Sequence, residues 1–230
     1  MKNYIVASSK NWFFEYLKSK KYENLSIINI TSKTELNIDY LSKINPRYIF
    51  SPHWSWKVDS TILNNFECIA FHTAPLPYGR GVSPIQNLII NGYEESPLCA
   101  LQMITEFDAG TIYKKRNMSH KGSLDEIFCR LAINCEKIIL DMCENEPLPS
   151  KQKGNSYVFK RLKEEDNKID FNLSIKEIYD RIRMVDSNEY NKAYINLGNY
   201  KIQFSKAKII ADKLIAQIKI IKSKKIHKKI

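Results

Sequence analysis

The sequence predicts an α/β fold: a Rossmann-like, doubly wound and mostly parallel sheet, followed by a small C-terminal module of a helix and a β-hairpin. Short strand-like segments alternate with segments of helical spacing through the first half of the chain, which is typical of βαβ units. A stretch with prolines and a glycine then precedes a helix and a strand pair. We therefore expect an N-terminal domain over residues 1–150 and a C-terminal module over residues 151–230.

The elements of the first half follow one another at short intervals. Strands are expected at Tyr4–Ala7, Leu25–Ile30, Tyr48–Phe50, Cys68–Phe71 and Leu98–Ile104. Helices are expected at Asn11–Leu17, around Ser60–Asn65 and over Pro84–Ile90. The last of these begins at a proline and ends before an Asn-Gly pair, and both residues are common at those positions.

The second half begins with a long amphipathic helix, expected over Leu124–Glu144. The residues that mark a linker after it are Pro147, Pro149 and Gly154. Beyond the linker we expect a helix over Ser174–Val185 and a hairpin that joins Ala193–Asn196 to Tyr200–Phe204. This module is expected to pack either on the first domain or on a second subunit.

The composition is that of a soluble globular protein, with 43% hydrophobic and 27% charged residues. The apolar runs are far shorter than the roughly 20 residues that cross a bilayer. The N-terminus leads directly into a strand-like segment and shows no secretory signal. We therefore expect a cytoplasmic protein with no membrane partner.

Five cysteines stand at irregular spacings in apolar surroundings. No Cys-x-x-Cys pair occurs in the sequence, so neither a redox motif nor a metal site is indicated. In a reducing compartment such cysteines are expected to be buried thiols that act as small hydrophobic side chains.

The net charge of +11 raises the question of nucleic-acid binding. Much of the excess lies in Lys219–Lys229, and a terminal lysine run is more often a solvated tail than a specific surface. Binding of nucleic acid is therefore not expected from the charge. The charge does suit an anionic ligand, such as a nucleotide diphosphate or a folate tail.

The strongest functional signal is the segment Phe71–Pro84, in which His72 ends a strand and a proline-rich loop follows. A lone histidine is more often structural, but a second loop with Asp108 comes one strand later. In doubly wound sheets, ligands bind beyond the carboxyl ends of the strands. We therefore expect the imidazole and the carboxylate to meet there as a pair capable of general acid–base work.

The two loops resemble the paired motif of the folate-dependent formyltransferases, Asn-x-His-x-Ser-Leu-Leu-Pro-x-x-Arg-Gly-x-x-Pro followed by Asp-x-Gly. The residues at matching positions are His72, Leu76, Pro77, Arg80, Gly81, Pro84, Asp108 and Gly110. With weaker matches downstream, the resemblance covers roughly residues 45–205. It implies the formyltransferase fold and N10-formyltetrahydrofolate as the formyl donor.

The resemblance also implies roles. His72 would take a proton from the attacking amine or stabilise the oxyanion, and Asp108 would orient His72 and stabilise its charge. The folate site would include Asp108 and four loop residues, which are Leu76, Pro77, Arg80 and Gly81. Arg80 is expected to brace the loop more than to take part in chemistry.

One departure from the motif concerns the asparagine two residues before the histidine, because this chain has Ala70 there. Loss of one hydrogen-bond donor to an oxyanion typically costs about 10²–10³ in rate. His53, after the neighbouring strand, is a candidate for supplying the missing donor. An alternative is that His53 only caps a turn beside Trp54.

The C-terminal module is too short for the full barrel of the tRNA enzymes and resembles the reduced ends of nucleotide-sugar N-formyltransferases. The expected acceptor is therefore a dTDP- or UDP-linked 4-amino-4,6-dideoxyhexose, or a 3-amino relative, destined for lipopolysaccharide O-antigen. Lys10 and Arg183 are the candidate diphosphate contacts, and a homodimer is expected. Two alternatives remain open: a methionyl-tRNA formyltransferase, and a non-catalytic paralogue that lacks the asparagine.

Overall fold

The computed structural model of the chain describes residues 2–22 and 24–222. These residues form two compact units whose segments interleave along the sequence. The first, here called the sheet unit, consists of Met1–Pro84, Glu95–Ser119 and Phe128–Lys160. The second, here called the hairpin unit, consists of Ile85–Glu94, His120–Ile127 and the chain from Arg161 onward. We expected a boundary between two domains at residue 150, and that boundary stays a prediction.

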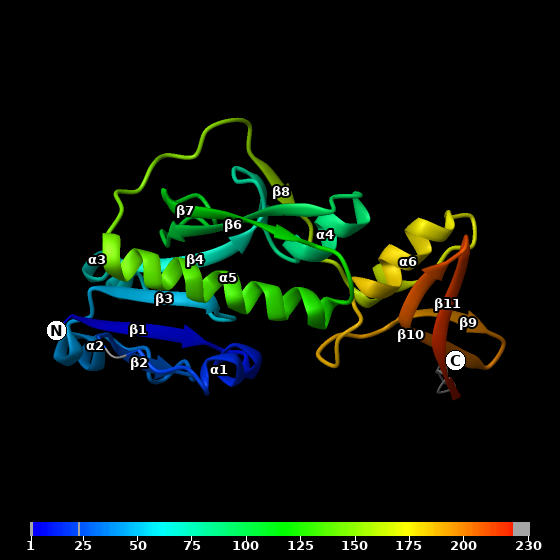
Figure 1. Cartoon of the computed structure of the whole chain (residues 1–230), viewed down its shortest axis with the longest axis horizontal. Coiled ribbons are helices and arrows are strands. Elements are labelled where there is room, and N and C mark those ends of the chain that lie inside the picture. The colour runs from blue at the N-terminus through cyan, green and yellow to red at the C-terminus, as the bar shows by residue number, and fades with distance from the viewer. Residues whose placement is uncertain (1, 23, 223–230) are drawn as a thin grey trace, which may run out of the picture. The chain divides into compact units, whose positions relative to one another are not determined.

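The sheet unit is built on a six-stranded sheet of order β2-β1-β3-β4-β6-β7 (Figure 1). Its strands are β1 (Asn3–Ser8), β2 (Ser26–Ile30), β3 (Tyr48–His53), β4 (Cys68–Thr73), β6 (Glu95–Gln102) and β7 (Ile112–Ser119). The first four in space are parallel to one another, whereas β6 runs antiparallel to β4 and β7 antiparallel to β6. The prediction of a mostly parallel, doubly wound α/β sheet is confirmed.

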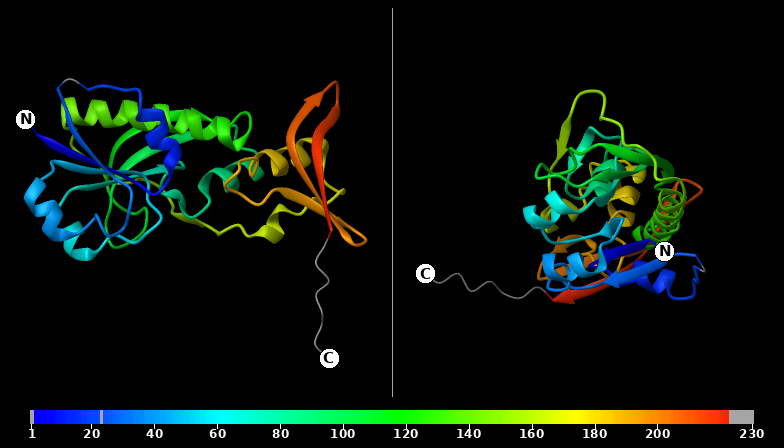
Figure 2. Two further views of the ribbon diagram at one scale, coloured as in Figure 1. Left: turned by 90° about the horizontal axis from the view of Figure 1, so that it is seen from below. Right: turned by 90° about the vertical axis from the view of Figure 1, so that its left-hand side faces the viewer.

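Helices cover both faces of this sheet (Figure 2, left). They are α1 (Asn11–Leu17), α2 (Ile38–Ile44), α3 (Ser60–Asn65) and α5 (Leu124–Asn145). On one face, Leu41 of α2 and Ile62 of α3 belong to an apolar cluster with Ile5, Ile49 and other strand residues. On the other face, Trp12 of α1 stacks on Phe128 of α5 at a ring-centroid distance of 5.4 Å. The sequence analysis missed only α2 among these helices, because its short and mostly exposed segment has little apolar periodicity.

Two short strands form a separate parallel pair in the sheet unit, β5 (Tyr78–Gly81) and β8 (Tyr157–Phe159). The stretch before β8 was expected to be a linker that leads out of the domain. Instead, Ser150 and Ile112 exchange two backbone hydrogen bonds of 2.8 and 2.9 Å, so the chain returns to the edge of the sheet. The prolines and the glycine of this stretch correctly indicated an irregular backbone. They did not indicate that this backbone packs against the edge of the sheet.

The hairpin unit contains α4 from Ile85 onward and, after the short helical turn η1 (Glu164–Asn167), helix α6 and a three-stranded antiparallel sheet of order β11-β10-β9. Its elements are α4 (Pro84–Ile90), α6 (Ile175–Arg183), β9 (Ala193–Leu197), β10 (Tyr200–Ile210) and β11 (Lys213–Lys222). The hairpin of β9 and β10 was predicted, and Leu197 pairs with Tyr200 across its two-residue turn. Strand β11 was not predicted.

The expected solvated lysine tail is therefore wrong for its first part. Lys219 and Lys222 pair with residues of β10 and lie within β11. The other lysines of that tail that were singled out, Lys224, Lys225, Lys228 and Lys229, lie outside the described residues.

Within residues 2–22 and 24–222, no helix combines the length and the apolarity needed to cross a membrane. In the same part of the chain, no group of three or more His, Cys, Asp or Glu side chains is placed to hold a metal ion. The cytoplasmic location stays a prediction.

Candidate active site

His72 and Asp108 lie together in the sheet unit, as the sequence analysis expected. Nδ1 of His72 and Oδ1 of Asp108 are 3.5 Å apart, and the two side chains are 7% and 16% exposed. His72 comes from β4, and Asp108 comes from the loop between β6 and β7. A titratable pair of this kind, largely shielded from water, is what general acid–base chemistry requires.

The route by which Asp108 reaches His72 differs from the expected one. Because β6 is antiparallel to β4, Gln102 at its end pairs with Ile69, three residues before His72. Three strand residues span roughly 10 Å. The loop after β6 must therefore fold back along the sheet to bring its carboxylate to the imidazole, and the rule for parallel strands does not explain the meeting.

Gly110 permits this return of the loop. A Cβ atom at Gly110 would lie 1.9 Å from the carbonyl oxygen of Gln102, closer than any two non-bonded atoms can approach. The backbone N–H of Gln102 also donates to the carbonyl of Thr111 over 2.8 Å. Asp108 itself has a φ of 55°, in the left-handed region, which aspartate tolerates better than most residues. The glycine of the Asp-x-Gly motif is thus required by close contact between two backbone segments.

Two glycines of β5 hold the pair of His72 and Asp108. Nε2 of His72 lies 2.7 Å from the carbonyl oxygen of Gly79. The N–H of Gly81 donates to Oδ2 of Asp108 over 2.9 Å. Because a carbonyl oxygen only accepts, Nε2 carries a hydrogen, and Nδ1 is the ring atom that can gain or lose a proton facing Asp108.

Arg80, between these glycines, braces the site as expected. Its Nη1 pairs with Oε1 of Glu106 at 2.9 Å, and its Nε and Nη2 donate to Oε1 of Gln152 over 3.2 and 3.0 Å. The sequence analysis missed Gln152 because it lies in the stretch assigned to a linker. No spacing or motif distinguished it there.

Leu76 and Pro77 have side chains in the interior of the sheet unit. Leu76 is buried in a cluster with Cys99, Leu101 and Ile112. The carbonyl of Pro77 accepts a hydrogen bond from the N–H of Tyr157 over 3.3 Å. The expected folate contacts of these two residues stay predictions. Because their side chains are buried, such contacts would be made by their backbone groups.

His53 ends β3, so it belongs to a strand rather than to the turn that the sequence analysis considered. The paired region of β3 and β4 ends at Ser51 and Ala70, two residues before His53 and His72 respectively. The carbonyl of His53 accepts from the N–H of Ser9 over 2.8 Å, and its ring meets Trp12 edge-on. Its role as a replacement donor stays a prediction.

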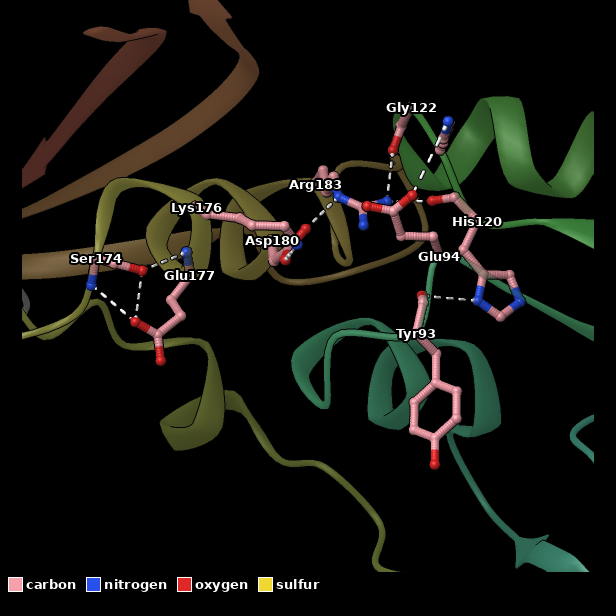
Figure 3. A network of polar contacts seen from close by, with 10 residues as sticks. Tyr93, Glu94, His120, Gly122, Ser174, Lys176, Glu177, Asp180 and Arg183 are labelled. Atoms are coloured by element: carbon pink, nitrogen blue, oxygen red, sulfur yellow. Dashed lines mark hydrogen bonds and ion pairs between the residues drawn. The ribbon is translucent and has the colours of Figure 1, made fainter. Parts of the chain in front are cut away.

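Arg183, the second candidate diphosphate contact, is buried and bonded within the hairpin unit. It is 6% exposed, and its Nε donates to Oδ1 of Asp180 over 2.6 Å in the hairpin unit. Its Nη1 donates to the carbonyls of His120 and Gly122 (Figure 3). Nε and Nη1 thus fix α6 to the turn at 120–122, a structural role. The assignment of Arg183 to a diphosphate stays a prediction that these contacts do not support.

Lys10 precedes α1 at its N-cap position. Its backbone N–H donates to Oγ of Ser8 over 3.3 Å, and its carbonyl accepts from the same hydroxyl over 3.2 Å. These contacts fix the backbone of the loop that follows β1. The side-chain ammonium of Lys10 takes no part in these two hydrogen bonds, and its contact with a diphosphate stays a prediction.

The four buried cysteines are poor nucleophiles in this structure, because burial keeps their thiols protonated. Burial raises the pKa of Cys68 to about 12 and that of Cys99 to about 11. Burial also raises the pKa of Cys143 to about 12, and that of Cys135 well above its ordinary value. Cys129 is exposed, so the expectation that all the cysteines are buried is wrong for it.

We expect iodoacetamide at pH 8 to alkylate the native protein at Cys129 alone, because the thiolate is the reactive form and burial keeps the other thiols protonated. Mass spectrometry of the intact protein should show one adduct in buffer and five in denaturant. A Cys129→Ser variant should take none in buffer. Modification of Cys68 or Cys99 at the rate of Cys129 would contradict the buried thiols.

Comparison with known proteins supports one family. The family model for the C-terminal domain of methionyl-tRNA formyltransferase matches residues 164–221. The methionyl-tRNA formyltransferase of Mycoplasma capricolum is 29% identical over 192 residues, which are 80% of this chain and 60% of that protein. The chain thus spans about 60% of the length of the curated relatives that it matches first.

Solved structures extend the comparison to the whole chain. A methionyl-tRNA formyltransferase from Clostridium thermocellum has a TM-score of 0.90 and 36% identity, covering 97% of this chain and 100% of that one. A 4-N formyltransferase from Francisella tularensis has a TM-score of 0.62 and 16% identity, covering 94% and 96%. At 16% identity the second likeness concerns the fold alone.

These comparisons overturn the expected acceptor. The relatives with substantial identity are named for methionyl-tRNA, and the matched C-terminal segment belongs to that family as well. The expectation of a dTDP- or UDP-linked amino sugar, and with it a role in lipopolysaccharide synthesis, was wrong. It rested on the shortness of the C-terminal module, and length alone does not distinguish the two groups, since the Clostridium chain is matched over its whole length.

Proposed function

The chain belongs to the folate-dependent formyltransferase family, and from this premise we propose that it transfers a formyl group from N10-formyltetrahydrofolate to the amino group of methionyl-tRNA. The observation that carries the proposal is the 36% identity, over the full length of both chains, to a structure named for that acceptor. The match at residues 164–221 supports the same acceptor independently of the catalytic loops.

The catalytic step follows from the atoms available at His72. The amine attacks the formyl carbon and must lose a proton, and tetrahydrofolate leaves as the tetrahedral intermediate collapses. Nδ1 of His72 takes the proton, since Nε2 already carries a hydrogen toward Gly79. Oδ1 of Asp108, 3.5 Å away, stabilises the imidazolium, which gives the proton to N10 of the folate as that nitrogen leaves. The folate site of this proposal includes Asp108 and the backbone near Leu76, Pro77, Arg80 and Gly81.

A second candidate function rests on one observation, the alanine at position 70. Ala70 and His72 are two residues apart in β4, so their side chains lie on the same face of the sheet. An amide side chain at position 70 would therefore point toward the reacting group. Without that donor, the protonated His72 or His53 must stabilise the oxyanion, or the rate falls by about 10²–10³. The alternative is therefore a non-catalytic paralogue that binds folate.

The charge of the hairpin unit supports an RNA acceptor. Its two long strands carry six lysines and no acidic residue, and Asp212 lies in the turn between them. These lysines are Lys201, Lys206, Lys208, Lys213, Lys219 and Lys222. Cations of this density neutralise phosphates and make binding depend steeply on salt.

A cytoplasmic homodimer remains part of the proposal. Large apolar side chains of the hairpin are exposed, and exposed apolar surface of this kind often marks an interface between proteins. They include Ile209, Ile210, Ile215, Ile218 and Ile220.

We expect the purified protein to formylate methionyl-tRNA when N10-formyltetrahydrofolate is supplied, with acid-gel separation of formylmethionyl-tRNA as the measurement. Binding of the tRNA should weaken linearly on a log–log plot against salt concentration. A dTDP-linked amino sugar serves as the negative control. Absence of turnover on methionyl-tRNA, with folate binding intact, would reject the proposal in favour of the non-catalytic alternative.

A further inference from the structure

We propose that Gln152 is a positioning residue that joins the loop carrying Asp108 to strand β5 and thereby sets the carboxylate against His72. The inference rests on the proposed function for its kinetic part, although its structural part can be measured without turnover. Gln152 belongs to the stretch between α5 and β8, which follows the catalytic loops in sequence by more than 40 residues.

The amide of Gln152 uses each of its hydrogen-bonding groups on the two loops of the site. Nε2 donates to the carbonyl of Asp108 over 2.6 Å and to the carbonyl of Gly110 over 2.9 Å. Oε1 accepts from Nε and Nη2 of Arg80, as described above. A single side chain therefore ties residues 108–110 to residue 80, and no donor of the amide is left over.

The two loops joined in this way are the ones that hold the catalytic pair. Gly79 and Gly81, on either side of Arg80, contact Nε2 of His72 and Oδ2 of Asp108. A displacement of the 108–110 loop relative to β5 would therefore change the separation of the imidazole and the carboxylate. The left-handed backbone of Asp108 is a conformation that most residues avoid, so it needs external fixation, and the two donated hydrogen bonds provide it.

The position of Gln152 is itself fixed from both sides. Two residues before it, Ser150 exchanges backbone hydrogen bonds with Ile112. After it, the N–H of Tyr157 donates to the carbonyl of Pro77, and the ring of Tyr157 stacks on that of Tyr78 at 5.2 Å. The amide is thus carried by a segment anchored to both partners of the site.

The other brace between these loops is weaker. Arg80 also pairs with Glu106, but the Glu106 side chain is 72% exposed and such ion pairs contribute little. The hydrogen bonds of Gln152 are shielded better, since Gln152 is only partly exposed. A substitution at position 152 should therefore allow the 108–110 loop to move away from β5.

Two substitutions distinguish positioning from general support. Gln152→Met keeps the length of the side chain and removes all four hydrogen bonds. Gln152→Glu keeps an oxygen for Arg80 but removes both N–H donors to the 108–110 loop. Asn145→Leu, at the exposed end of α5, replaces an amide that donates to Asp141 rather than to either loop of the site, and is the matched control.

The kinetic readout is the split between kcat and KM in formylation of methionyl-tRNA. We expect both Gln152 variants to lower kcat by up to about 100-fold with KM for the tRNA within a factor of about three, because misplacement of a catalytic group by 1 Å has effects of that size. The Asn145→Leu control should retain the wild-type kcat. Wild-type kcat in Gln152→Glu would overturn the proposal, since the donors would then be dispensable.

The structural readout is hydrogen exchange at the amide of Gly81, which donates to Asp108. In both Gln152 variants this amide should exchange at least tenfold faster, while amides in the middle of β1 keep their protection. This measurement needs no acceptor, so it separates a wrong positioning role from a wrong proposed function. Unchanged exchange at Gly81 in Gln152→Met would overturn the inference even if the protein formylates methionyl-tRNA.

Discussion

Substitution of His72 by asparagine is expected to lower kcat for formyl transfer by about 10²–10⁴, the range that a positioned general base contributes. The physical reason is that Nδ1 is the ring atom free to take the proton of the amine, and asparagine has no group that titrates near neutral pH. Binding of the folate should persist, because the predicted folate contacts lie in the backbone of neighbouring residues. Single-turnover kinetics and calorimetric titration of tetrahydrofolate measure the two effects separately.

The partner of His72 provides the control for this result. Asp108→Asn should produce a loss of similar order, and the double variant should lose little more than His72→Asn alone, because residues that act as a unit have non-additive effects. Asp39→Asn, at an exposed aspartate of α2, makes the same chemical change remote from the pair and should retain the wild-type rate. Fully additive losses in the double variant would contradict the pair acting together.

Substitution of Gly110 by alanine is expected to destabilise the protein by about 3 kcal/mol and to remove most of its activity. The added Cβ would lie 1.9 Å from a backbone oxygen, so the loop must move away from the end of β6. That movement would carry Asp108 away from His72, since only one residue separates Asp108 from Gly110. Urea unfolding measures the stability, and kcat measures the displacement.

Gly92→Ala provides the comparison. Gly92 has a φ of 80°, but a Cβ there would meet nothing within 4 Å. This substitution should cost only about 1 kcal/mol, for backbone conformation alone, and should leave kcat unchanged. If Gly110→Ala were no more harmful than Gly92→Ala, the close approach of the loop to Gln102 would not be what requires the glycine.

The elements that the sequence predicted well share one property: their signal is local. Helix Asn11–Leu17 was predicted at its bounds and the hairpin at its turn near Gly198, because helical periodicity and turn chemistry depend on neighbouring residues. The end of β10 was not predicted, since the strand continues to Ile210 rather than ending at Phe204. Strand β11 was missed because the lysines of its second half, Lys219 and Lys222, were interpreted as the start of a charged tail. A run of lysines indicates exposure to solvent, but an exposed strand can have the same lysine content as an unstructured tail.

The catalytic pair was also predicted, but its geometry was not. His72 and Asp108 were identified from two motifs, whereas the direction of β6 has no local signature, because parallel and antiparallel strands have the same alternation. The burial of Arg183 was missed for a related reason. A basic residue on a helix is expected to be exposed until a partner distant in sequence, here the carbonyl of His120, is known.

What the sequence by itself determined is therefore the two members of the His72–Asp108 pair and the order of most elements, since residue type and short-range periodicity indicate both. Only the tertiary structure decided how the Asp108 loop returns to β4 and that Gln152 holds it there. Both depend on hydrogen bonds between segments tens of residues apart, and the free energy of such contacts is set by the arrangement of the folded chain rather than by any neighbouring residue.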